Sequence, residues 1–240
     1  MSEQKVARLR WAVHHMPIPI ILSWSGGKDS MLALEALLGD GHYEVMALLT
    51  TVNRAHGRIS MHGVREGLLD AQAASLGIPL DKIYLPEKVA NDEYAAAMRT
   101  QLEIYRGRGI RHVAFGDIFL ADIRAYRERQ LSEVEMQCVF PLWGQSTAAL
   151  AQRFVEHNFR ATLSCVDTQA IDATFAGREY DTELLGELPS DCDPCGENGE
   201  FHSFVYAGPL LREPIAIRTG EHVLRDGRFA FCDLVPLERV

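Results

Sequence analysis

The chain has 240 residues, 47% hydrophobic side chains and a net charge of −9 at neutral pH. This length and composition fit one or two compact domains and exclude a disordered or fibrous chain. Nucleic acid is not an expected partner of a chain with this negative charge, because electrostatic binding to phosphate backbones usually requires clustered lysine and arginine.

Two further features bear on location. The five cysteines are an odd number, which argues against a disulfide framework. The apolar run at residues 18–22 is too short for a membrane span or a signal-peptide core. We therefore expect a cytoplasmic protein without membrane association.

In chain order, strand-like and helical patterns alternate through the first two thirds of the sequence. The predicted strands lie at residues 19–23, 43–52, 82–85, 112–115, 138–142 and 161–166, and the predicted helices at 29–38, 64–76, 91–105, 122–134 and 146–157. Strands that alternate with helices pair in parallel through right-handed crossovers. The sequence thus predicts the α/β class, with an open parallel sheet and flanking helices.

After about residue 185, prolines and glycines interrupt this pattern. Residues 215–237 have the pattern of a β-hairpin that turns at 225–228. We expect a smaller α+β C-terminal domain and divide the chain into residues 1–130 and 131–240.

The segment SGGKDS follows the first predicted strand and opens the first helix. It comprises Ser25, Gly26, Gly27, Lys28, Asp29 and Ser30. Glycines at such a turn let backbone N–H groups approach an anion, and the hydroxyl and ammonium groups add donors. Asp29 could cap the helix or hold a magnesium ion. An ordinary strand–turn–helix is the alternative, but the combination favours phosphate binding.

The spacing differs from that of the common GxxxxGK[ST] loop, because an aspartate and not a hydroxyl residue follows Lys28. A second unusual stretch places Glu197, Glu200 and His202 within six positions. Such a set could position an amine, move protons or ligate a metal. An acidic turn that leads into a strand at residues 201–206 explains it equally well, so the residues alone leave both interpretations open.

SGGKDS resembles the pyrophosphate loop of the N-type ATP pyrophosphatases, which have an adenine nucleotide alpha-hydrolase fold and release AMP and pyrophosphate. The resemblance implies that residues 25–30 hold the phosphate end of ATP with Mg²⁺. It also implies that Thr50 borders the adenine, and that Gly116 and Asp117 lie near the ribose and phosphates.

The stretch GENGEFHSFV at residues 196–205 narrows the resemblance. Together with SGGKDS, MHGVR at residues 61–65 and FGDI at residues 115–118, this stretch resembles the motifs of the diphthine–ammonia ligase family. The sequences of these motifs resemble those of bacterial members of the family. The family's activity implies that a small-molecule or protein-borne carboxylate is activated with ATP and then amidated by ammonia. Lys28, Glu197, Glu200 and His202 would be the catalytic residues. Diphthine is not an expected substrate in bacteria.

Two other functions are open at this point. A tRNA-modifying sulfurtransferase of the same superfamily would use Cys192 and Cys195 as reactive thiols, although a single CxxC without further ligands is weak support for a metal site. A nucleotide sensor would hold ATP or AMP without cleaving it. The oligomeric state is open, a homodimer included.

Overall fold

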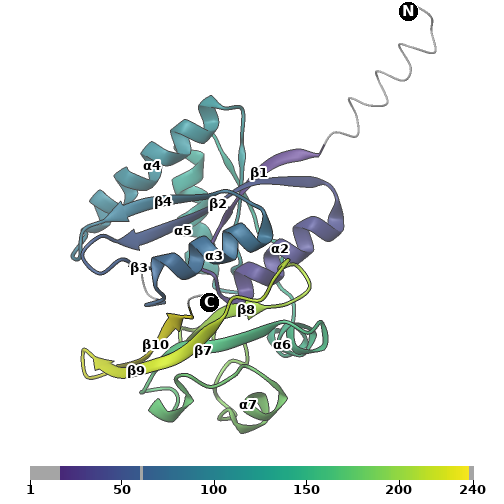
Figure 1. Ribbon diagram of the computed structural model, residues 1–240. Coiled ribbons are helices and arrows are strands. Elements are labelled where there is room, and N and C mark those ends of the chain that lie inside the picture. The colour runs from purple at the N-terminus through teal and green to yellow at the C-terminus, as the bar shows by residue number, and fades with distance from the viewer. Residues whose placement is uncertain (1–16, 60–61, 238–240) are drawn as a thin grey trace, which may run out of the picture.

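The computed structural model describes residues 17–59 and 62–237 (Figure 1). Five strands form a parallel sheet, and β1 lies at its centre. On one side β1 pairs with β2, which pairs with β4; on the other side β1 pairs with β5, which pairs with β6. These strands are β1 (Ile18–Ser23), β2 (Tyr43–Asn53), β4 (Leu80–Leu85), β5 (His112–Ala114) and β6 (Gln137–Val139). The predicted open α/β sheet is confirmed.

Helices cover both faces of this sheet. Successive residues of β1 point to opposite faces, so Ile20 and Leu22 join one hydrophobic core and Ile21 joins the other. The first core contains residues of α2 (Lys28–Asp40) and α3 (Glu66–Leu76), and the second contains residues of α4 (Asn91–Gly107) and α5 (Ala121–Ser132). A strand that is apolar on both faces is typical of a buried parallel sheet.

The C-terminal part forms an antiparallel sheet with the order β8-β7-β10-β9. Its strands are β7 (Arg160–Asp167), β8 (Phe201–Ala207), β9 (Ile217–Arg225) and β10 (Phe229–Pro236), and α6 (Thr147–Glu156) precedes them. The predicted hairpin is confirmed. The connection lies between the paired residues Arg225 and Phe229, and Asp226 and Gly227 in it both have positive φ, at 52° and 63°.

Three short elements escape prediction, namely β3 (Arg58–Ile59), the 3₁₀ turn η1 (Ala173–Phe175) and α7 (Thr182–Glu187). Each is too short to show a period in the sequence. The strand expected at residues 138–142 ends at Val139 in the structure. Among the helices of the described ranges, none combines the length and the apolar character that a membrane crossing requires.

The two sheets share one hydrophobic core. It runs from Leu22 of β1 through α2 and α3 to Leu163 of β7 and Phe204 of β8. In Figure 1, α2 and α3 lie between the parallel sheet and strands β7 and β8. The division at residues 130 and 131 stays a prediction, and β6 of the parallel sheet lies beyond it.

Candidate functional site

The SGGKDS segment lies at the carboxyl end of β1, between this strand and α2. Because β2 and β5 flank β1 on opposite sides, this is the point where the strand order reverses, and open α/β sheets bind ligands there. Gly26 has a φ of 78°, a conformation that L side chains rarely adopt. The first intrahelical bond joins Met31 N–H to the Gly27 carbonyl at 3.1 Å, so the earlier N–H groups of α2 lack intrahelical acceptors.

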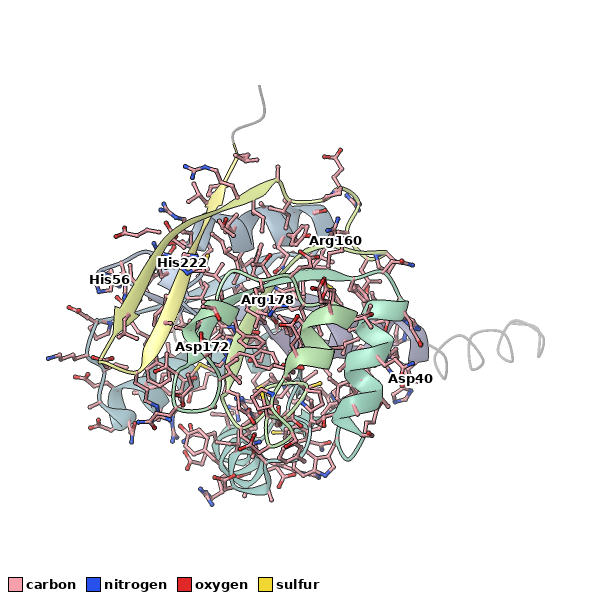
Figure 2. The ribbon with its side chains drawn as sticks, turned by 90° about the horizontal axis from the view of Figure 1, so that it is seen from below. Asp40, His56, Arg160, Asp172, Arg178 and His222 are labelled. Atoms are coloured by element: carbon pink, nitrogen blue, oxygen red, sulfur yellow. The ribbon has the colours of Figure 1, made fainter. Side chains whose placement is uncertain are left out.

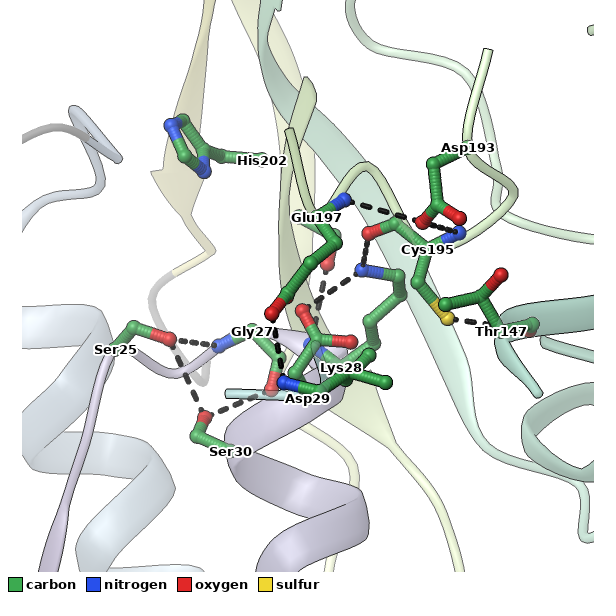
Figure 3. A network of polar contacts seen from close by, with 12 residues as sticks. Ser25, Gly27, Lys28, Asp29, Ser30, Thr147, Asp193, Cys195, Glu197 and His202 are labelled. Carbon is green, nitrogen blue, oxygen red and sulfur yellow. Dashed lines mark hydrogen bonds and ion pairs between the residues drawn. The ribbon is translucent and has the colours of Figure 1, made fainter. Parts of the chain in front are cut away.

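Hydroxyl groups of the segment hold its shape. Ser25 Oγ accepts a bond from Gly27 N–H at 3.2 Å, and Ser30 Oγ donates to the Gly27 carbonyl at 2.8 Å (Figure 3). The two hydroxyls also lie 3.3 Å apart. The turn is therefore held in shape by hydrogen bonds of its own side chains.

The GENGEFHSFV motif, which lies partly on β8 of the antiparallel sheet, makes hydrogen bonds to the SGGKDS turn. Ser203 of β8 accepts a bond from Lys28 N–H through its hydroxyl at 3.1 Å, which caps α2 from 175 positions away in the sequence. The Val205 N–H donates to the Gly26 carbonyl at 2.9 Å. A Cβ on Gly27 would lie 2.9 Å from the Ser203 carbonyl oxygen, so only glycine fits at this contact.

Gln72 of α3 joins these parts, and its side chain is fully buried. Its Nε2 donates to the carbonyls of Gly26 at 3.0 Å and Val205 at 2.7 Å, and its Oε1 accepts from Trp24 Nε1 at 2.7 Å. One amide thus links the end of β1, the SGGKDS turn and β8.

Lys28 is only 2% exposed. Its ammonium group contacts Asp29 Oδ2 at 2.8 Å and donates to the Cys195 carbonyl (Figure 3). The centroid of the Phe201 ring lies 5.2 Å from the ammonium nitrogen. Burial alone would lower the pKa of Lys28, but the attraction of Asp29 and weaker attractions nearby raise it above its ordinary value. The lysine therefore keeps its positive charge at neutral pH.

The other oxygen of Asp29 is suited to a metal ion. Asp29 Oδ1 is buried and has no hydrogen-bond partner in the part of the chain that the structure describes. A buried carboxylate oxygen needs a partner, and Mg²⁺ prefers such oxygens beside phosphates. The loop therefore fits a magnesium ion at Asp29.

A cavity of about 490 Å³ opens above the loop, which is within the usual size range of ligand pockets. Most of the site residues predicted from the sequence line it, namely Ser25, Gly27, Lys28, Asp29, Ser30, Thr50, Gly116, Asp117, Glu197 and His202. Gly26 lies behind the turn, against Gln72. The two motifs, about 170 positions apart, thus form a single site.

Glu197 lies on the cavity wall and also shapes it. Its Oε1 accepts bonds from the N–H groups of Ile118 at 2.6 Å and Phe119 at 3.3 Å. Burial raises the pKa of Glu197 above the ordinary value, against the opposing effect of the Ile118 bond.

Glu200 does not line the cavity, and its predicted catalytic role stays a prediction. It is 6% exposed, and its Oε1 accepts bonds from Asp193 N–H at 3.0 Å and Asn198 Nδ2 at 2.9 Å. An extended chain through Glu200 would have placed it beside His202, but β8 begins at Phe201, after a turn with Gly199 at φ 91°. Glu200 instead braces the turn that carries Glu197.

His202 faces the ring of His62, which comes from the segment between β3 and α3. The two ring centroids are 4.3 Å apart with an interplanar angle of 37°, and both residues line the cavity. Burial, with a smaller contribution from Lys28, lowers the pKa of His202 to about 4. Burial, His202 and Lys28 also lower the pKa of His62 well below its ordinary value. Both imidazoles are neutral at pH 7.

On the β5 side, Gly116 and Asp117 form the wall. A Cβ on Gly116 would lie 3.0 Å from the backbone of Asp29, so this position needs glycine for the sheet to approach the loop. Asp117 pairs with Arg127 of α5, with Arg127 Nε 2.7 Å from Asp117 Oδ2. The Arg127 guanidinium also lies 4.3 Å from the centroid of the Phe115 ring.

Neither Cys192 nor Cys195 has the properties of a reactive thiol. Burial raises the pKa of both to about 12, so they stay protonated at neutral pH. Within the described ranges, no group of three or more His, Cys, Asp or Glu side chains is arranged to hold a metal ion. Cys195 contributes its carbonyl oxygen, which accepts the Lys28 ammonium.

Four residues of the site were not singled out from the sequence: His62, Gln72, Arg127 and Ser203. His62 and Ser203 lie within the quoted MHGVR and GENGEFHSFV stretches, so those stretches carried a signal for them. Gln72 and Arg127 sit inside predicted helices, where nothing separates them from ordinary helical polar residues.

Comparison with known proteins places the chain in a family. A comparison with curated proteins gave no significant match. One solved structure that matches is the U34-tRNA thiolase NcsA from Methanococcus maripaludis with its 4Fe–4S cluster. It is 19% identical, the match covers 56% of this chain and 55% of the thiolase chain, and the TM-score is 0.35. At these values the likeness says nothing about activity.

The family models are decisive. The model of the diphthamide synthase N-terminal domain matches residues 19–138, and that of the diphthamide synthase C-terminal domain matches residues 146–234. Each match contains one of the two motifs that form the cavity. Since the two models together cover most of the chain, the protein belongs to the diphthamide synthase family.

Proposed function

We propose that the protein is an ATP-dependent ligase that adenylates a substrate carboxylate and converts it to an amide. A carboxylate oxygen bonds to the α-phosphorus of ATP while the bond to the pyrophosphate oxygen breaks. Ammonia or an amine then forms the carbon–nitrogen bond as AMP leaves, and one proton is released.

One observation carries the proposal. The phosphate-binding turn and the GENGEFHSFV motif are joined by backbone and side-chain hydrogen bonds, and they face one cavity. A protein that only held a nucleotide would not need a carboxylate and two neutral imidazoles opposite the phosphate loop. An enzyme that handles an acceptor and a nitrogen nucleophile beside ATP does need polar groups there.

The loop residues would hold the phosphates of ATP, and Asp29 would hold Mg²⁺ through its unpartnered Oδ1. Mg²⁺ held there would supply charge neutralisation for the phosphates. Lys28 presents a fixed positive charge, and fixed charges stabilise a leaving anion without reorganisation at the moment of reaction. Thr50 and Asp117 line the same cavity, where the adenine and ribose would lie.

The sulfurtransferase alternative needs reactive thiolates. The Cys192 and Cys195 thiols stay protonated at neutral pH, which argues against it. A nucleotide sensor would bind ATP or AMP at the same site as the proposed ligase but would not cleave ATP. Product analysis therefore separates it from a ligase.

The test is AMP formation with a panel of carboxylates, MgATP and ammonium chloride. Lys28→Met keeps the length of the side chain and removes its charge, and we expect it to lower AMP formation by about 10²–10³-fold, the typical cost of one transition-state donor. Lys88→Ala is the matched control, since Lys88 is exposed and does not line the cavity.

Thermal melting of each variant shows whether it is folded. Wild-type release of ADP, or AMP formation that Lys28→Met leaves unchanged, would contradict the proposed function. Tight ATP binding without AMP from any acceptor would favour the sensor.

A further inference from the structure

The CDPC segment, Cys192–Cys195, is a sequence motif to which the proposed reaction gives no task. Its thiols stay protonated at neutral pH, yet two of its backbone carbonyls lie beside the SGGKDS turn and the core. The Cys195 carbonyl accepts a bond from the Lys28 ammonium, and the Pro194 carbonyl accepts one from the Tyr180 hydroxyl at 2.6 Å. The segment therefore meets the site through its backbone.

Cys195 is held by all of its polar groups (Figure 3). The residue is 1% exposed. Its N–H donates to Asp193 Oδ1 at 2.9 Å, and its thiol donates to the Thr147 carbonyl at the start of α6 at 3.4 Å. Because the chain holds Cys195 at both of these groups, the carbonyl that accepts Lys28 has a fixed place.

Asp193 ties the segment to the turn that follows it. Besides the bond from Cys195, its Oδ1 accepts one from Glu197 N–H at 3.2 Å, and its own N–H donates to Glu200 Oε1 at 3.0 Å. An aspartate that accepts bonds from backbone N–H groups just after it fixes a local turn. The same side chain thus sets the backbone of Cys195 and of the cavity residue Glu197.

Tyr180 holds the segment from the side of the core. Its side chain is 1% exposed, and its ring packs edge-on against Phe154 with the centroids 5.4 Å apart. The Phe201 ring lies 6.0 Å away, and the Tyr180 centroid is 5.8 Å from the Lys28 nitrogen. Close packing on several sides fixes the ring, so its hydroxyl is a fixed partner for the Pro194 carbonyl.

The Lys28 ammonium has a donor left after these contacts. An ammonium group carries three N–H donors, and Asp29 Oδ2 and the Cys195 carbonyl each accept one. Within the described ranges, no third acceptor contacts it. Lys28 also lines the cavity, so a donor and the positive charge remain for a ligand there.

We propose that the CDPC segment is a clamp that positions the Lys28 ammonium for the departing pyrophosphate, with Tyr180 and Asp193 as its positioning residues. The inference rests on the proposed function for the use of this charge and adds how the charge is held. A lysine side chain is a flexible four-carbon stem, and a carbonyl oxygen fixes its end without neutralising it. A charge fixed in this way needs no reorganisation during the reaction.

The test observes Lys28 directly and needs no turnover. Protein is labelled with ¹³C at the Cε atom of lysine, and the chain contains four lysines, namely Lys5, Lys28, Lys82 and Lys88. Lys28→Met assigns the Lys28 signal. Ring currents of the two nearby aromatic side chains should displace this signal from that of the exposed Lys88.

Two variants release the clamp at different points. Tyr180→Phe removes the hydroxyl and keeps the ring, and Asp193→Ala removes the acceptor of the Cys195 N–H. We expect both to move the Lys28 signal toward that of Lys88. Where an acceptor yields AMP, both should lower kcat about two- to tenfold, the range for one hydrogen bond, and change KM for ATP by less than about twofold.

Two further variants are the controls. Asp193→Asn keeps an Oδ1 acceptor, so it should retain the wild-type Lys28 signal and kcat. Tyr126→Phe is matched to Tyr180→Phe, and it should change neither, since Tyr126 is 37% exposed and does not line the cavity. Thermal melting shows that each variant is folded.

An unmoved Lys28 signal in folded Tyr180→Phe and Asp193→Ala would overturn the inference. Equal displacement in Asp193→Asn would assign the effect to the charge of Asp193 and would also overturn it. The proposed function fails separately, because a Lys28 signal that moves as expected supports the clamp even if no acceptor yields AMP. Conversely, AMP formation that both releasing variants leave unchanged contradicts the positioning role and leaves the proposed function standing.

Discussion

At the scale of single residues, the site is built from groups whose charge is set by burial. Lys28 stays charged because Asp29 and the Cys195 carbonyl accompany it into the interior. His202 lacks such a partner and stays neutral. One cavity therefore holds a fixed cation and a neutral acceptor.

His202 makes protein stability depend on pH. Its pKa is about 4 in the folded protein and near the ordinary value of 6.5 in the unfolded chain. Between these values the unfolded chain binds a proton that the folded protein does not, so the free energy of unfolding falls as the pH is lowered. The full effect is at most about 3–4 kcal/mol, from about 2.5 pKa units at 1.36 kcal/mol each.

The measurement is denaturant unfolding of wild type and His202→Phe at several pH values from 4 to 7. We expect the wild type to lose stability more steeply than the variant as the pH falls below 6.5. His222→Phe is the control, because His222 is exposed on the β9–β10 hairpin (Figure 2). Parallel curves for wild type and His202→Phe would show that this histidine titrates normally.

At the scale of elements, the candidate site depends on how β8 meets the turn after β1. The period of the apolar residues predicts the strands and helices of the parallel sheet, and the Gly-Gly turn predicts where a phosphate binds. No sequence pattern of this kind predicts the contact between β8 and the turn. It joins Ser203 to Lys28 and Val205 to Gly26 across more than 170 positions.

Glu200 shows the limit of local reasoning. Alternation along a strand places Glu200 beside His202 only if the strand already includes Glu200. The strand begins one residue later, and the positive φ of Gly199 turns the Glu200 side chain toward Asp193. The start of β8 matches the alternative of an acidic turn before a strand at residues 201–206, but the spacing of the charged residues alone does not decide between the two interpretations.

Gln72 is the element contact that we expect to matter most for stability. Gln72→Ala would leave Trp24 Nε1 and the carbonyls of Gly26 and Val205 without their partner, all in the interior. Unsatisfied buried groups cost about 1–3 kcal/mol each, so we expect a loss on the order of 3 kcal/mol and weaker ATP binding.

Chemical denaturation and isothermal titration with an ATP analogue measure these two effects. Gln145→Ala is the matched control, because Gln145 is exposed and makes one bond, to the Pro141 carbonyl. It should change stability by less than about 0.5 kcal/mol. A similar small change in Gln72→Ala would mean that the turn and β8 hold together without this amide.

At the scale of the whole molecule, a parallel sheet supplies the SGGKDS loop and an antiparallel sheet supplies the groups opposite it. The shared core between them makes the cavity a property of both sheets. The parallel pairing and the place of the SGGKDS loop after the first strand were predictable because parallel α/β connections follow few rules. The packing of the second sheet onto α2 and α3 was not, since it depends on the side chains of both.

The most direct test of the account follows an oxygen atom. An acceptor carboxylate that supports AMP formation is labelled with ¹⁸O, and the AMP produced with MgATP and ammonium is analysed by mass spectrometry. If the carboxylate is adenylated, one ¹⁸O atom passes into the phosphate of AMP. Unlabelled AMP, or ADP in place of AMP, would contradict the central claim that chemistry occurs at the α-phosphorus through the acceptor's oxygen.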